Sequence, residues 1–203
     1  SLFEPGRVLM LSIPVYIVSA FGLIAVAFVV FRIFVRRSYL QGRRLTWFST
    51  FLEFSIFSLF GTFTCLDLPP GWPPTDVNPV LRIAGWLCMT IGLSLMLILI
   101  SWFGWSRAMG QKVDVLKQSG PYRFTRNPQI IACFTAVFGY ALLWPSWHTL
   151  GWVILFSAIA HMMVLTEEEH LRNIFREEYV QFCVRVPRYI GVRLKLNVAV
   201  FLP

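Results

Sequence analysis

The chain has 203 residues, of which 57% are hydrophobic and only 14% are charged. Soluble domains carry about 25% charged residues, so this composition excludes an ordinary soluble protein and indicates an integral membrane protein with one compact domain. The formal net charge of +8 does not indicate nucleic-acid binding, because excess Lys and Arg in a membrane protein usually mark its cytoplasmic loops.

Five apolar segments predict an all-α membrane protein, because an open sheet leaves backbone polar groups unsatisfied in lipid. The first three are long enough to cross the bilayer. The last two hold only 17 residues each and are joined by a short turn, which predicts a tight helical hairpin. The segments are Val8–Phe31, Leu45–Leu66, Val80–Phe103, Pro128–Trp144 and Thr149–Leu165. We expect a single membrane domain, with three helices in residues 1–103 and the hairpin in residues 104–203.

Basic side chains gather on one side of these segments. Arginines crowd residues 32–44, and Lys and Arg recur in the loop before the fourth segment and in the tail after the fifth. Residues 67–81, between the second and third segments, contain neither Lys nor Arg. By the positive-inside rule, the N-terminus lies outside and the basic loops and C-terminal tail are cytoplasmic.

A polar stretch, SGPYRFTRNP at residues 119–128, precedes the fourth segment. Pro128 suits the first turn of a helix, where its missing N–H costs nothing. Arg123 and Arg126 lie beside that helix N-terminus, and guanidinium groups together with free backbone N–H groups would form an anion site. A basic loop that meets lipid headgroups explains the same charges.

Two ionisable residues are expected at membrane depth, where such residues are rare and are candidates for function. Glu53 lies within the second segment and His161 lies near the end of the fifth. A buried carboxylate such as Glu53 needs a partner or a proton. His161 also fits a histidine that simply bonds to a neighbouring helix. It shares a helix face with Glu168, seven residues later, if the helix is continuous.

Three glutamates, Glu167 to Glu169, follow the fifth segment. Carboxylates at a helix C-terminus interact unfavourably with the helix dipole, so these glutamates would destabilise a helix that ended here. They would not do so if the helix continued beyond them. They form either an acidic turn paired to Arg172 or a cation-binding carboxylate pair. An anion site and a carboxylate pair at one depth would fit a zwitterionic, cation-bearing ligand such as S-adenosylmethionine, although the residues alone do not select it from other ligands.

The tail that begins with these glutamates predicts an amphipathic helix, which either continues or follows the fifth segment. Apolar side chains recur there every three or four residues, and Val186-Pro187 ends the pattern. These apolar positions are Leu171, Ile174, Phe175, Tyr179, Phe182 and Cys183. Residues 191–203 either fold back onto the membrane surface or cover a site.

Four cysteines, Cys65, Cys88, Cys133 and Cys183, lack the spacing of metal ligands. We expect buried free thiols rather than disulfides, and no metal site.

Two motifs together resemble a known family. GPYR-x-x-R-N-P is followed about forty residues later by EE-x-x-L-x-x-x-F-x-x-x-Y-x-x-F and then by VPRYI. This pattern, over residues 114–190, is similar to that of the isoprenylcysteine carboxyl methyltransferase and phospholipid methyltransferase superfamily of membrane enzymes. The resemblance implies S-adenosylmethionine-dependent methyl transfer at the cytoplasmic side of the bilayer, to a lipophilic acceptor that enters laterally from the membrane.

The resemblance also implies roles for individual residues. One wall of the cofactor site would comprise Gly120, Tyr122, Arg126, Asn127 and Pro128, and the facing pair would be Glu167 and Glu168. The catalytic candidates are Arg188, which matches a C-terminal arginine near the site, and Glu53 and His161, which with Asp114 would assist an acceptor that must lose a proton.

The chain departs from the family at four positions. Asn127 and Asp114 stand where histidine is common, Ile130 where tyrosine is common, and Arg176 where glycine follows phenylalanine. The acceptor therefore stays open between a prenylated cysteine carboxylate, a phospholipid amine, and a smaller lipophilic thiol or acid. An NADPH-dependent membrane reductase and a catalytically silent membrane scaffold remain alternatives of other classes.

Overall fold

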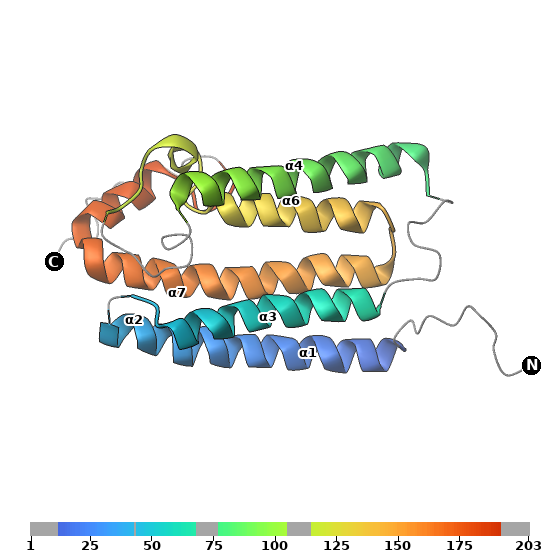
Figure 1. Ribbon diagram of the computed structural model, residues 1–203, viewed down its shortest axis with the longest axis horizontal. Coiled ribbons are helices and arrows are strands. Elements are labelled where there is room, and N and C mark those ends of the chain that lie inside the picture. The colour runs from blue at the N-terminus through green and yellow to red at the C-terminus, as the bar shows by residue number, and fades with distance from the viewer. Residues whose placement is uncertain (1–11, 43, 68–76, 105–114, 192–203) are drawn as a thin grey trace, which may run out of the picture.

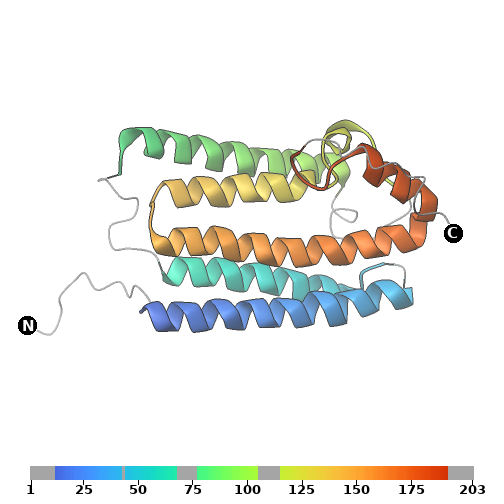
Figure 2. The ribbon, with the colours of Figure 1, turned by 180° about the vertical axis from the view of Figure 1, so that it is seen from behind.

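The computed structural model describes residues 12–42, 44–67, 77–104 and 115–191, which form a bundle of long helices lying side by side (Figure 1, Figure 2). These residues contain helices and no strand, as the sequence predicts. The helices are α1 Ile13–Val29, the π-helical turn η1 Val30–Val35, α2 Arg36–Gly42, α3 Trp47–Leu66, α4 Pro79–Phe103, the 3-10 turn η2 Gly120–Arg123, α6 Pro128–Leu142 and α7 Trp147–Arg185. The sequence-based predictions about Asp114 and about residues 192–203 concern residues outside the described ranges.

Four stretches of helix are long and apolar enough to cross a bilayer: Ile13–Gly42, α3, α4 and α7. The chain is therefore a multi-pass membrane protein. The 15 residues of α6 extend only about 22 Å at 1.5 Å per residue, less than the roughly 30 Å hydrocarbon core. The expected hairpin of α6 and α7 is present, with α6 packed between α4 and α7 (Figure 1).

Two helices are longer than predicted. Residues 32–42, expected in a loop, continue the first helix through η1 and α2, because no proline or glycine interrupts the chain between Gly22 and Gly42. The fifth segment was expected to end at Leu165, but α7 continues to Arg185 for the same reason, with no breaker between Gly151 and Pro187. Of the two arrangements that the sequence left open, the continuous one is therefore observed: the tail helix is the last part of α7, and the second hairpin helix is longer than its apolar segment.

The tail part of α7 bends back over the polar stretch before α6 (Figure 2). Arg176 has φ 44° and ψ −116°, which breaks the helical path within α7. Apolar side chains of this tail pack in one cluster with residues before α6, and Val186 ends the helix. The cluster consists of Leu116, Tyr179, Phe182 and Val186, with Tyr122, Leu171, Phe175 and Cys183 against it.

The four cysteines are free thiols, as predicted. The prediction that all four are buried is wrong for Cys65, which is exposed. The other three cysteines are partly buried.

Small residues allow α4 and α6 to approach closely. A methyl group added at Gly92 of α4 would lie 2.5 Å from the backbone nitrogen of Ala136 and 2.6 Å from the carbonyl oxygen of Ala132. Gly139 of α6 faces the backbone of α4 in the same way. Small residues at helix contacts drive association in lipid because they let the backbones pack tightly.

We expect Gly92→Ala to lower the melting temperature of the detergent-solubilised protein, because overpacking of a tight contact costs about 1–3 kcal/mol. The matched control is Gly61→Ala in α3, where an added methyl meets nothing within 4 Å. That change removes only the helix penalty of glycine, up to about 1 kcal/mol, so its melting temperature should hold or rise. Equal losses in both variants would contradict the close α4–α6 contact.

We expect Arg176→Gly to stabilise the protein by about 1 kcal/mol, because glycine adopts positive φ without the strain that a side chain brings. Arg172→Gly, one turn earlier in regular helix, should instead destabilise by about 1 kcal/mol. Chemical unfolding of both variants measures the difference. Destabilisation by both would show that residue 176 does not hold the strained bend.

Candidate functional site

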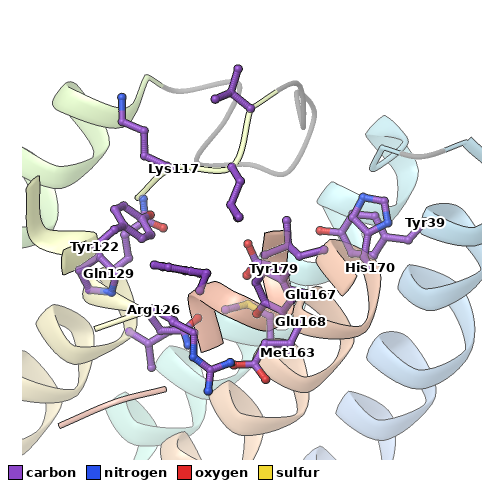
Figure 3. A pocket seen from close by; sticks show the side chains of 17 residues that line it. Tyr39, Lys117, Tyr122, Arg126, Gln129, Met163, Glu167, Glu168, His170 and Tyr179 are labelled. Carbon is purple, nitrogen blue, oxygen red and sulfur yellow. The ribbon is translucent and has the colours of Figure 1, made fainter. Parts of the chain in front are cut away.

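A polar cavity opens at the end of the bundle that carries η2 and the start of α6, which we call the η2 end (Figure 3). Its volume is about 90 Å³. Its walls come from η2 and the first turn of α6 on one side, and from α2 and α7 on the other. The polar and aromatic side chains that line it are those of Tyr39, Lys117, Tyr122, Arg126, Asn127, Gln129, Glu167, Glu168, His170 and Tyr179.

Glu168 is the centre of the ionic contacts beside this cavity. Its Oε1 accepts from Arg126 Nη1 at 2.7 Å and from Arg188 Nε at 3.0 Å, and its Oε2 accepts from Arg188 Nη2 at 2.7 Å. The Glu168 side chain is only 7% exposed and that of Arg126 only 12%. Two guanidinium groups therefore hold one buried carboxylate, and α7 is tied both to the segment before α6 and to the segment just after its own end.

The backbone after α7 is bound to the polar stretch before α6. Arg126 N donates to the carbonyl of Pro187 at 2.9 Å. Thr125 Oγ1 and Asn127 Nδ2 both donate to the carbonyl of Arg188, at 3.1 and 3.0 Å. Because the Asn127 side chain is used in this way, it does not cap α6. The helix N-terminus at the cavity therefore keeps its positive end.

Several polar groups in the cavity make no hydrogen bond to any described residue. Arg126 Nε and Gln129 Nε2 are buried, and neither has a hydrogen-bond partner among the described residues. The half-buried carboxylate of Glu167 likewise makes no hydrogen bond within the described ranges. Buried donors and carboxylates are normally satisfied, so this arrangement is suited to a ligand with both an anionic and a cationic group.

Aromatic rings form the rest of the lining. Tyr39 of α2 stacks on His170 with ring centroids 3.9 Å apart. Burial, and to a lesser degree the charge of Glu167, raises the pKa of Tyr122 well above its usual range, so its hydroxyl stays protonated and can donate. Tyr122 also stacks on Trp102 at the end of α4.

Gly120 lies behind this wall rather than in it. Its φ of 61° favours glycine, and an added methyl would lie 3.0 Å from the ring of Trp102. The residue shapes the turn that carries Tyr122.

Glu169 faces away from the cavity, toward the first helix. Its Oε1 accepts from Arg36 Nη2 at 2.6 Å and its Oε2 from Arg32 Nη1 at 3.4 Å. Of the two alternatives for the glutamates, pairing with Arg172 is not seen at Glu169, which pairs instead with arginines 32 and 36 on the helix beside α7.

A second, apolar cavity lies between α6 and α7. This groove has a volume of about 730 Å³, and it is lined mainly by Ile131, Phe134, Phe138, Phe156 and Ala160. His161 and Tyr189 stand at its polar end, with His161 Nδ1 3.0 Å from the Tyr189 hydroxyl. Ile130 lines both the groove and the polar cavity, so the two cavities are neighbours.

The structure brings most of the sequence-predicted site residues together. Those that line the polar cavity are Tyr122, Arg126, Asn127, Pro128, Glu167 and Glu168. Arg188 joins them through Glu168, and His161 lies in the groove. Glu53 of α3 interacts electrostatically with Glu167 and Tyr39 but lines neither cavity.

Sequence reasoning missed Tyr39, Gln129 and Tyr189. Tyr189 stands within the VPRYI motif, and Gln129 is the first residue after the GPYR-x-x-R-N-P motif, so both positions could have been found from the motifs. Nothing in the sequence around Tyr39 marks it, because it reaches the cavity only through the unpredicted extension of the first helix.

An all-helical membrane protein with a polar cavity at one end, next to an apolar groove, fits an enzyme that joins a polar and a lipophilic ligand. The phospholipid methyltransferase family model matches residues 80–178. This part of the chain, from α4 into the tail of α7, is thus similar to the phospholipid methyltransferases, a family of membrane methyltransferases. A search of curated proteins and one of solved structures found no match.

We expect Glu168→Gln to destabilise the protein by about 3 kcal/mol, because removal of one partner leaves buried charges uncompensated. The melting temperature measures the loss. Glu169→Gln is the matched control, since its arginine partners are substantially exposed and such pairs contribute little. A larger loss at Glu169 than at Glu168 would contradict the central role of Glu168.

Proposed function

We propose that the protein transfers a methyl group from S-adenosylmethionine to a lipophilic acceptor at the cytoplasmic membrane face, in the manner of isoprenylcysteine carboxyl methyltransferases. The observation that carries the proposal is the contact between a polar cavity and an apolar groove at Ile130. The family match supports methyl transfer as the reaction. The groove supports an acceptor that is drawn from the membrane.

The polar cavity has groups that fit the cofactor. The unpaired Nε of Arg126 and Nε2 of Gln129, together with the N-terminus of α6, suit its carboxylate. Glu167 suits its ammonium group, and Glu168 keeps Arg126 in place. Tyr122 and Tyr39 offer ring surfaces and hydroxyls for the remaining polar part. When bound there, S-adenosylmethionine supplies an electrophilic methyl group on a sulfonium.

The chain contributes mainly by positioning. A direct displacement requires acceptor, methyl carbon and sulfur in line, and holding reactants in such a geometry lowers the barrier substantially. Arg188 and Glu168 fix the backbone that closes the site. The apolar groove keeps water from the acceptor. In this proposal His161 lies next to the reacting end of the acceptor. Glu53 does not touch either ligand and acts only through its electrostatic interaction with Glu167.

The proposed topology places α6 as a fifth crossing, completed by the turn that precedes α7. The N-terminus is then outside, and the η2 end and the C-terminus are cytoplasmic, as the basic residues on that side favour. Residues 1–203 form one membrane domain, in which residues 104–203 carry both cavities.

Phospholipid N-methylation is the second candidate, which the family description favours. It uses the same cavity and differs in the acceptor alone. A membrane reductase would instead require that the cavity bind NADPH, and a silent scaffold would require no ligand.

We expect S-adenosylhomocysteine to bind the purified protein saturably in isothermal calorimetry. Glu167→Gln should weaken binding by about 10- to 100-fold, the range for one hydrogen bond between charged groups. Glu169→Gln, whose carboxylate faces the first helix, should bind like the parent. NADPH should not raise the melting temperature, whereas S-adenosylmethionine should.

The proposal fails if the parent shows no saturable binding, or if Glu167→Gln binds as tightly as the parent. Stabilisation by NADPH alone would favour a reductase.

A further inference from the structure

Part of the polar cavity is built by the first helix. Tyr39 of α2 and His170 of α7 both line it, and they are only 6% and 4% exposed. Their rings stack with centroids 3.9 Å apart and an angle of 16° between the ring planes. In Figure 3 this pair lies across the cavity from Tyr122 and Gln129. The stacked pair, which we call the aromatic wall, therefore stands on the side away from the N-terminus of α6.

One face of α7 holds the first helix in this place. Thr166, Glu169 and His170 are spaced three and four residues apart, which puts them on the same side of the helix. Thr166 Oγ1 donates to the Phe31 carbonyl in the π-helical turn η1 at 3.3 Å, and Glu169 accepts from an arginine of α2 at 2.6 Å. Helical turns of the π type are frequent at functional sites. Tyr39 is thus fixed against α7 by contacts that flank the two cavity glutamates in the sequence.

The opposite side of the cavity has a different chemistry. The buried Nε of Arg126 and Nε2 of Gln129 have no partner among the described residues. Together with the N-terminus of α6 they suit the carboxylate of an amino acid, and Glu167 suits its ammonium group. Tyr122 stands on this same side in Figure 3. A ligand whose amino-acid group binds here extends its remaining part toward the aromatic wall.

The aromatic wall has the side chains that bind flat rings. Tyr and His are among the residues on which nucleic-acid bases stack in proteins. In S-adenosylmethionine the amino-acid group and the purine ring are at opposite ends of the molecule. The two chemistries on opposite sides of the cavity therefore match the two ends of this cofactor.

We propose that the aromatic wall binds the purine ring of the cofactor and that Tyr39 is a specificity-determining residue for this ring. This inference rests on the proposed use of S-adenosylmethionine. Tyr39 lies outside residues 80–178, the segment that the family model matches, so the family match does not imply this role. The first helix is then part of the cofactor site as well as part of the membrane bundle.

Two ligands that share the purine test this role: S-adenosylhomocysteine, and methylthioadenosine, which has no amino-acid group. Calorimetry with the purified full chain measures the first affinity directly and the second by competition. Tyr39→Leu should weaken both by about tenfold, the effect of one lost stack between a base and an aromatic side chain. Glu167→Gln should weaken S-adenosylhomocysteine alone, because methylthioadenosine has no ammonium group.

Two further variants separate the ring from general packing. Tyr39→Phe keeps the stacking surface and removes the hydroxyl, so its affinity for both ligands should stay close to that of the parent. Phe34→Leu is the matched control, because Phe34 lies on the first helix, is 44% exposed and lines neither cavity. It should bind both ligands like the parent.

Nuclear magnetic resonance gives a direct signature of stacking. The purine protons of methylthioadenosine should shift upfield on binding to the parent and to Tyr39→Phe, because they enter the ring currents of the aromatic wall. The shift should shrink in Tyr39→Leu.

Several results would overturn the role of Tyr39. These are parent-like binding of both ligands by Tyr39→Leu, an equal loss of affinity in Tyr39→Phe and Tyr39→Leu, or a parent that binds methylthioadenosine without the upfield shift or does not bind it at all. In each case saturable binding of S-adenosylhomocysteine to the parent leaves the proposed function standing. A parent that does not bind S-adenosylhomocysteine would instead refute the proposed function and this inference with it.

Discussion

The shared carboxylate of Glu168 is the contact on which the site depends. It binds Arg126 from the segment before α6 and Arg188 from the segment after α7. These segments also bond through their backbones, from Arg126 N to the Pro187 carbonyl. One buried carboxylate thereby joins the segment before α6 to the segment after α7 at the η2 end. Both segments contribute residues to the walls of the cavities.

The bend at Arg176 makes this closure possible. A straight α7 of 39 residues would extend about 58 Å, and its end would lie far from the start of α6. The turn brings Tyr179 and Phe182 onto Leu116 instead. Burial of these rings stabilises the bend and offsets the strain of positive φ at a residue with a long side chain.

Sequence reasoning predicted the helical class, the start of α6 at Pro128 and the end of α7 at Val186, because hydropathy and proline chemistry act locally. The motif resemblance placed Arg126 and Glu168 on facing walls of one site, whereas the structure joins them in a direct ion pair. Sequence reasoning misjudged where the first helix ends, because a charged residue such as Arg36 is typical of a loop until its pairing with Glu169 of another helix is known. The place of Tyr39 in the lining of the polar cavity and the contact between His161 and Tyr189 depend on tertiary packing. No local sequence pattern predicts such contacts.

Ile130, the side chain common to both cavities, has a kinetic consequence. The polar cavity opens at the η2 end, and the groove opens between α6 and α7, so each has its own mouth. Under the proposed function, the cofactor and the acceptor would then exchange with two different surroundings without passing one another. Neither has to leave before the other arrives, so the geometry imposes no compulsory order of addition or release.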